Sequence, residues 1–105
     1  MKSKIISLFA VAACLGTSPV RADQALANTK GCTACHDMAS KKIGPSYQDI
    51  AKKYAGQKDA PATLAKNILD GSKGVWGEMP MPATKTLGVS EADAKKLVAW
   101  ILQQK

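Results

Sequence analysis

The chain has 105 residues, which is enough for one small domain. Its 15 basic residues outnumber 8 acidic ones, for a formal net charge of +7. From residue 23 onward every basic side chain apart from one histidine is a lysine, whereas nucleic-acid readers usually also use the arginine fork. The composition argues against nucleic-acid binding and favours docking to an acidic protein partner.

The first 22 residues have the pattern of a secretory signal peptide. Two lysines precede an uncharged, mostly apolar run at residues 5–16, and Val20 and Ala22 occupy the positions that signal peptidase prefers. The run is too short for a membrane span, which needs about 20 apolar residues. We therefore expect cleavage after Ala22, export to the periplasm, and a single domain over residues 23–105.

A second interpretation of the leader stays open. The letters "VAAC" at residues 11–14 also resemble the lipobox of bacterial lipoproteins, in which Cys14 is lipidated and becomes the first residue. The cleavage after Ala22 fits the following sequence better, because "DQALANTK" already has the pattern of a helix.

Residues 23–105 have the pattern of helices joined by loops, with no strand pattern. Helix caps and glycine or proline breakers mark the boundaries. The predicted helices run from Gln24, capped by Asp23, to about Lys30; from Ser46 through Tyr54; from Asp59, with Pro61 in its first turn, to Gly71; and from Ser90 onward.

The last helix has the clearest signal. Ser90 and Asp93 match a capping box, and apolar residues follow at helical spacing, namely Ala94, Leu97, Val98 and Ile101. This stripe needs a packing partner, and the first helix with Leu26 is the candidate. Before it, residues 71–89 are rich in Gly and Pro and show no helical period, so we expect a long functional loop.

The motif "CTACH" at residues 32–36 carries the chemistry. A thioredoxin-type dithiol expects a βαβ context, and a zinc site usually needs four ligands; this helical pattern, with His36 as the only histidine, supplies neither. A plain disulfide would leave His36 without a purpose. CxxCH is the attachment signature of c-type haem, with thioether bonds from Cys32 and Cys35 and iron ligation by His36. The haem would also supply core volume that a domain with few aromatic residues lacks.

A methionine is the expected second axial ligand, because no other histidine exists. Met38 is too close to His36 to cross the haem plane, which leaves Met79 and Met81 in "GEMPMPA". Met81 is the better candidate, since a proline on each side restricts its backbone and fixes where its side chain points. A thioether suits haem iron and raises its reduction potential. Met79 is expected to fill space.

The runs "GCTACH", "IGPSYQDIAKKYAGQ", "GSKGVWGEMPMP" and "WILQQK" resemble the small bacterial class I monohaem cytochromes c, of the cytochrome c-551 type. The resemblance covers residues 23–105. It implies an all-α cytochrome c fold of four to five helices wrapped around one covalently attached haem, with crossed terminal helices. It also implies His36 and Met81 as axial ligands.

The same resemblance implies two further contacts. The carbonyl of Pro45 would accept a hydrogen bond from the His36 imidazole, and the Trp76 indole would bind a haem propionate, although core packing is the alternative for Trp76. Trp100 is expected in the core. Relatives often continue "PMPPN", with an asparagine amide near the ligating sulfur, whereas this chain has "PMPAT". Whether Thr84 offers its hydroxyl there is left open.

These features predict a periplasmic single-electron carrier that is monomeric, is not an enzyme, and contacts membranes only peripherally. The resemblance implies redox protein partners, with a membrane cytochrome complex as donor and a nitrite reductase or terminal oxidase as acceptor. Lys52 and Lys53 are expected on a solvated helix face. Four other lysines flank the predicted haem segments and are expected to steer an acidic partner: Lys30, Lys41, Lys42 and Lys73.

The main alternative is a haem enzyme or gas sensor with a labile sixth ligand. It would need a distal histidine or arginine, and residues 23–105 contain no arginine and only His36. A thiol–disulfide protein is the second alternative. Carbon monoxide binding would favour the first and titratable thiols the second.

Overall fold

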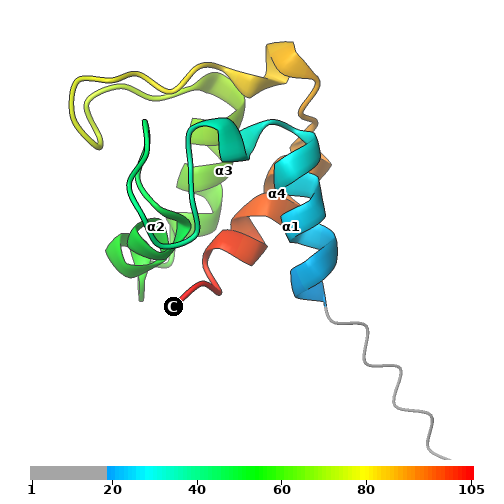
Figure 1. Cartoon of the computed structure of the whole chain (residues 1–105), viewed down its shortest axis with the longest axis horizontal. Coiled ribbons are helices and arrows are strands. Elements are labelled where there is room, and N and C mark those ends of the chain that lie inside the picture. Colours follow the sequence, from blue (N-terminus) through cyan, green and yellow to red (C-terminus); the bar gives the residue numbers. More distant parts are fainter. Residues whose placement is uncertain (1–18) are drawn as a thin grey trace, which may run out of the picture.

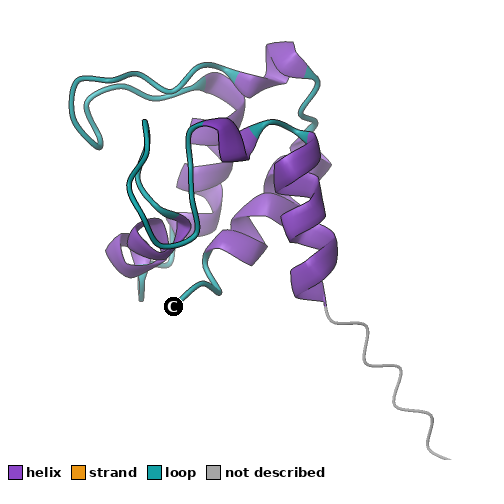
Figure 2. Cartoon of the chain, in the orientation of Figure 1, coloured by secondary structure: helices purple, strands orange, loops and turns teal. Residues whose placement is uncertain are grey.

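The computed structural model describes residues 19–105, which form four α-helices and two short 3-10 helices (Figure 1). Within that range the only strand-like pairing is one isolated antiparallel bridge between Ser72 and Met81, so the predicted all-α class is confirmed (Figure 2). The elements are α1 (Pro19–Thr29), η1 (Cys32–Ala34), α2 (Tyr47–Tyr54), α3 (Ala60–Asp70), η2 (Thr84–Leu87) and α4 (Glu91–Ile101).

Helix α4 is the centre of the packing. Its predicted capping box is present, because Ser90 Oγ accepts from the Asp93 N–H and the Asp93 carboxylate accepts from the Ser90 N–H, each at 3.1 Å. All four residues of the predicted apolar stripe are buried. They pack α4 against α1, α2 and α3, so the terminal helices lie against each other (Figure 1). On α1 the fully buried residue is Ala27, with Leu26 partly buried beside it.

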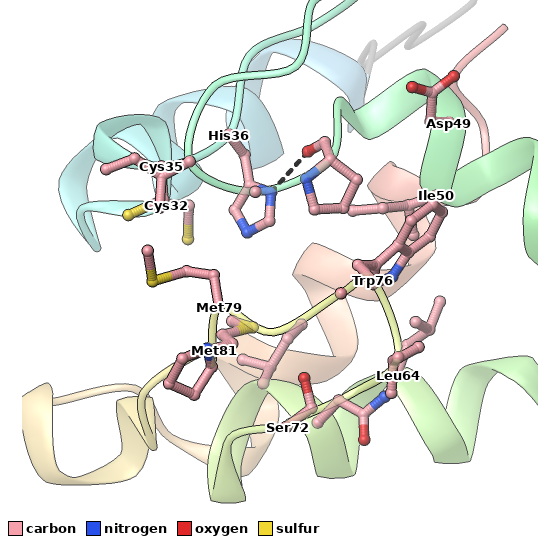
Figure 3. Close-up of a pocket in the computed structure, with 18 of the residues that line it drawn as sticks. Cys32, Cys35, His36, Asp49, Ile50, Leu64, Ser72, Trp76, Met79 and Met81 are labelled. Carbon is pink, nitrogen blue, oxygen red and sulfur yellow. Dashed lines mark hydrogen bonds between the residues drawn. The ribbon is translucent and has the colours of Figure 1, made fainter.

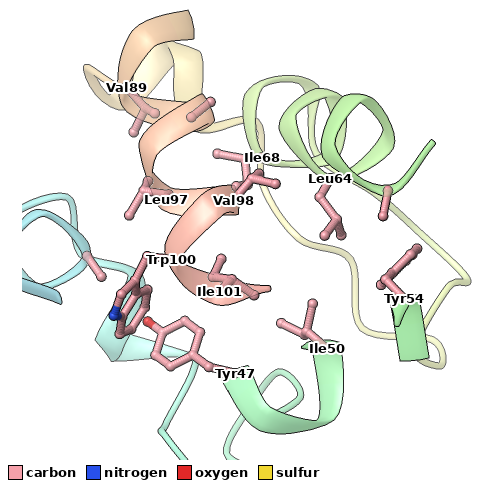
Figure 4. Close-up of a cluster of buried hydrophobic side chains, with 13 residues drawn as sticks. Tyr47, Ile50, Tyr54, Leu64, Ile68, Val89, Leu97, Val98, Trp100 and Ile101 are labelled. Atoms are coloured by element: carbon pink, nitrogen blue, oxygen red, sulfur yellow. The ribbon is translucent and has the colours of Figure 1, made fainter. Parts of the chain in front are cut away.

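Helices α2 and α3 close the other side of the core (Figure 4). Ser46 caps α2 by accepting the Asp49 N–H at 3.1 Å, and a proline in the first turn opens α3. Tyr47 on α2 meets Trp100 on α4 edge to face, with ring centroids 4.8 Å apart. Trp100 is 1% exposed, as predicted for a core residue.

Two predicted boundaries were wrong. Helix α1 begins at Pro19 rather than at Gln24, so Asp23 lies inside the helix instead of capping it. The reason is that proline is tolerated in a first helical turn, where its missing N–H has no partner to lose. The stretch expected to be loop up to Val89 contains η2, because a single 3-10 turn is too short to show a helical period.

Residues 1–18, which include most of the predicted signal peptide and Cys14, lie outside the described residues. Among the helices of residues 19–105, none combines the length and the apolar character required to cross a membrane.

Candidate functional site

A largely apolar cavity of about 420 Å³ opens between two segments of the chain (Figure 3). One wall is the cysteine–histidine segment, residues 30–46, and the facing wall is the methionine loop, residues 71–83. The volume lies within the range of roughly 300–1,000 Å³ typical of cofactor sites. All six predicted site residues line it: Cys32, Cys35, His36, Pro45, Trp76 and Met81.

The two cysteines are presented by a tight turn at the start of the cysteine–histidine segment. Both the Cys35 and His36 N–H groups donate to the Cys32 carbonyl, at 3.2 and 3.0 Å. Burial raises the pKa of the Cys32 thiol, which disfavours the thiolate that a redox dithiol requires. Across residues 19–105 no three His, Cys, Asp or Glu side chains gather closely enough to hold a metal ion.

The imidazole of His36 is held by a backbone carbonyl. Its Nδ1 lies 2.7 Å from the Pro45 oxygen, and because a carbonyl only accepts, Nδ1 carries the proton. The other ring nitrogen, Nε2, is left with its lone pair and faces the side of the pocket that holds the methionines (Figure 3). This bond is the one that the resemblance implied, and it fixes the tautomer and orientation that a metal-binding histidine needs.

Gly44 permits this position of the ring. A Cβ atom on Gly44 would lie 2.7 Å from Cε1 and 3.0 Å from Nδ1 of His36, well inside van der Waals contact. The sequence showed Gly44 only as part of a Gly–Pro break. The absence of a side chain at Gly44 therefore also lets the backbone at residue 44 approach the His36 imidazole.

Met81 is fixed through its backbone. Its N–H donates to the Ser72 carbonyl at 2.8 Å, and its carbonyl accepts from the Ser72 N–H at 3.2 Å. Met81 is partly buried against the core, whereas Met79 is 67% exposed, although both side chains line the pocket. The two candidate ligands therefore differ in how firmly each is held.

Gly71 permits the pairing of Met81 with Ser72. It has φ 81° and ψ 173°, a combination that is nearly restricted to glycine. A Cβ atom there would lie 2.6 Å from the Met81 carbonyl oxygen. Sequence reasoning identified Gly71 only as a helix stop, because nothing local in the sequence reveals that another segment of backbone passes so close.

Trp76 lies in the exposed part of the methionine loop. It is 38% exposed and lines the pocket, so the alternative of plain core packing was wrong. The Lys53 ammonium lies 4.9 Å from the centre of its ring, a cation–π contact between α2 and the loop. Lys53 is exposed, as expected for a solvated helix face, and its ammonium reaches the Trp76 ring from there.

The four lysines expected around the pocket divide into two pairs. Lys41 and Lys73 line the pocket. Lys42 donates to the Thr33 carbonyl at 3.0 Å, while Lys30 donates to the Gly88 carbonyl at 2.9 Å. Lys30 also lies 3.6 Å from the Asp93 carboxylate, so it joins the end of α1 to the start of α4. The steering role predicted for Lys30 does not fit this arrangement.

A family model for cytochrome c matches residues 21–105. The chain belongs to the cytochrome c family. It is 54% identical over 84 residues to cytochrome c-552 of Hydrogenobacter thermophilus, which covers 80% of this chain and 83% of the relative. It is 43% identical to cytochrome c-551 of Pseudomonas aeruginosa, covering 96% of this chain and 95% of that one. The predicted family is therefore confirmed.

Solved structures agree with this assignment. The crystal structure of Nitrosomonas europaea cytochrome c552 superposes with a TM-score of 0.74 at 49% identity, covering 78% of this cytochrome and 99% of that chain. The family and the CxxCH of residues 32–36 together imply covalently bound haem c. The residues present fit that group, because two thiols, an imidazole nitrogen and thioethers converge on one apolar cavity. The chain is thus a small electron-carrying cytochrome and not an enzyme, as predicted.

Proposed function

We propose that this cytochrome is a periplasmic single-electron carrier in which His36 and Met81 are the axial ligands of the haem iron. The observation that carries the proposal is that His36 and Met81 line opposite walls of one cavity. The free Nε2 of His36 faces the wall that holds Met81, and each residue is anchored by hydrogen bonds to main-chain atoms. Met81 rather than Met79 is supported by its two backbone bonds and its partial burial.

When bound, the haem supplies a one-electron iron couple. The chain contributes geometry and an apolar environment. The Pro45 carbonyl keeps the proton on Nδ1 of His36, so that Nε2 stays available in both oxidation states. Apolar side chains exclude water from the pocket and thereby limit rearrangement of solvent during electron transfer, namely Ile50, Leu64, Ile68, Leu97 and Ile101.

The mouth of the pocket supports docking to an acidic redox protein. Ile43 is 57% exposed and Val75 is 38% exposed, and both line the pocket together with Lys41 and Lys73. Apolar contacts surrounded by lysines suit a small, transient interface in which charge steers encounter. A membrane cytochrome complex as donor and a nitrite reductase or terminal oxidase as acceptor are the partner classes we propose.

The export half of the proposal rests on residues 1–22. Cleavage after Ala22 would leave Asp23 as the first residue, partway along α1. Mass measurement of protein purified from periplasm distinguishes this outcome from lipidation at Cys14, because the two products differ in their first residue.

The axial ligands are tested by absorption spectra of ferric and ferrous protein. The parent should contain covalent low-spin haem and show the weak far-red band of ferric iron bound to sulfur. Met81→Ala should abolish that band, and the matched control Met79→Ala should retain it. The ligation proposal is wrong if Met79→Ala loses the band while Met81→Ala keeps it, or if the reduced parent promptly binds carbon monoxide at neutral pH.

A further inference from the structure

The methionine loop is closed at its base by three ties, one between its own two ends and two to the end of α3. Met81 pairs with Ser72 through two backbone hydrogen bonds. The Thr84 hydroxyl donates to the Ile68 carbonyl, and the Lys85 ammonium lies 2.8 Å from the Asp70 carboxylate. The loop extends away from the helices beyond these ties (Figure 1). Its base is therefore fixed at the point where Met81 sits.

The three ties differ in burial. Thr84 is 8% exposed and Ile68 is also 8% exposed, so the bond between them is inside the protein. The Lys85 and Asp70 side chains are 57% and 45% exposed, and a surface pair of this kind contributes little to stability. The Thr84 bond is thus the main side-chain tie at the base.

The acceptor of this bond has no partner inside its own helix. Ile68 is among the last four residues of α3, and their carbonyls receive no hydrogen bond from within the helix. Leaving a buried carbonyl unpaired is costly, so the Thr84 hydroxyl satisfies a group that would otherwise destabilise the end of α3. The Thr84 backbone is held as well, because its own carbonyl accepts from the N–H groups of Gly88 and Val89.

We propose that Thr84 is a positioning residue for Met81, and that its hydroxyl latches the end of the methionine loop to α3. The proposal rests on the proposed role of Met81 as the axial ligand. Only Pro82 and Ala83 separate the two residues, and the fixed φ of Pro82 makes this connection stiff. A displacement of Thr84 is therefore passed on to the Met81 backbone and to its sulfur.

The latch acts through position and not through a hydrogen bond to the sulfur. The single hydroxyl proton of Thr84 is already donated to the Ile68 carbonyl. Removing the hydroxyl should consequently leave the energy of the sulfur–iron band unchanged. What should change is how often Met81 leaves the iron.

The test compares Thr84→Val, Thr84→Ser and Thr86→Val in haem-loaded protein. Thr86 is the matched control, because its hydroxyl donates to the nearby Ala83 carbonyl at 2.8 Å on the exposed surface. Two readouts report the opening of the loop: hydrogen exchange of the Met81 amide, and binding of added imidazole to the ferric iron in competition with Met81. In Thr84→Val we expect both to increase about tenfold, which corresponds to about 1.4 kcal/mol. Thr84→Ser and Thr86→Val should match the parent.

Each result separates the latch from the ligation on which it depends. A parent without the far-red sulfur band contradicts the axial role of Met81. A parent with the band, and a Thr84→Val variant equal to it in both readouts, overturns the latch alone. A shifted band energy in Thr84→Val would show that the hydroxyl acts on the sulfur instead.

A measurement on the parent covers the case in which Thr84→Val does not fold. If the base of the methionine loop opens as one unit, hydrogen exchange should give the amides of Ser72, Met81 and Val89 the same opening free energy. These three opening free energies should also depend on denaturant in the same way. Three different opening free energies would overturn the latch without any variant.

Discussion

The two walls of the pocket are held in opposite ways. In the cysteine–histidine segment the hydrogen bonds join residues close in sequence: the Gly44 N–H donates to the Cys35 carbonyl at 2.8 Å, and the Tyr47 N–H to the Asp37 carbonyl at 2.9 Å. In the methionine loop the bonds join its two ends, and within the described chain residues 73–80 make no backbone–backbone hydrogen bond. Backbone hydrogen bonds hold the first wall at several points along its length, and they hold the second only at its base.

This difference shows how one small domain combines a fixed site with an adaptable surface. Met81 lies at the fixed base of its loop, whereas Val75, Trp76 and Met79 lie in the part that extends beyond it. The Lys53 contact with Trp76 links that part to α2. Contacts with a partner can therefore adjust without moving the proposed ligand.

The largest effect is expected from Gly71→Ala, which acts on the base of the methionine loop. The new Cβ would meet the Met81 carbonyl at 2.6 Å and the backbone would keep an unfavourable conformation. Together these should lower the free energy of unfolding by about 3 kcal/mol or more and remove the sulfur band. Denaturant titration and the ferric absorption spectrum measure the two effects.

Gly74→Ala is the matched control for this variant. Gly74 has the same φ of +81°, but a Cβ atom added there would meet no heavy atom within 4 Å beyond its chain neighbours. It should lose only about 1–2 kcal/mol, from backbone strain, and keep the sulfur band. Equal losses in the two variants would mean that the approach of Met81 to Gly71 does not matter.

Gly44→Ala tests the opposite wall and should have a smaller effect on stability. The backbone of Gly44 is not in the left-handed region, so the cost comes from the contact of 2.7 Å with the His36 ring, about 1–3 kcal/mol. A displaced ring weakens its bond to the Pro45 carbonyl and makes the imidazole a less basic ligand. The reduction potential, measured by voltammetry, should therefore rise while the sulfur band persists.

Gly71→Ala and Gly44→Ala together test whether the two walls of the pocket are stabilised independently. Gly71→Ala should remove the sulfur band and leave the His36 side intact, and Gly44→Ala should do the reverse. If both variants lost the band together, the two walls would be one cooperative unit and not two independently stabilised segments.

The sequence predicted the first wall better than the second, for a physical reason. Cys32, Cys35 and His36 lie within one turn, so their spacing alone carries the chemistry. Met81 was distinguished from Met79 only by its flanking prolines, because its fixed position depends on Ser72 and on α3, which are close to it only in the fold.

What the sequence could not reveal depends on close approach between segments. Glycine is required at position 44 because the His36 ring lies close by, and at position 71 because the Met81 carbonyl does. Neither neighbour can be located from the sequence before the fold is known. The direction of the Thr84 hydroxyl was left open for the same reason. Lys30 was assigned to steering because its neighbours in sequence are the cysteines, whereas its partners in space are Gly88 and Asp93.

The smallest expected effect lies at the Lys30–Asp93 junction, which joins the start of the cysteine–histidine segment to the start of α4. Hydrogen bonds from Ser90, chiefly from its backbone N–H, and the charge of Lys30 hold the pKa of Asp93 below its ordinary value of 3.8. The charged carboxylate thus stabilises the folded state above the unfolded pKa, and this contribution is lost as the pH falls through the lower folded pKa.

In urea titrations of haem-loaded protein, Asp93→Asn should lower the urea midpoint at pH 7, and the difference in midpoint from the parent should shrink between pH 4 and pH 2. Asp59→Asn is the control, because the Asp59 side chain caps no N–H group, and it should show no such convergence. A difference that stays constant down to pH 2 would mean that the charge of Asp93 does not stabilise the junction.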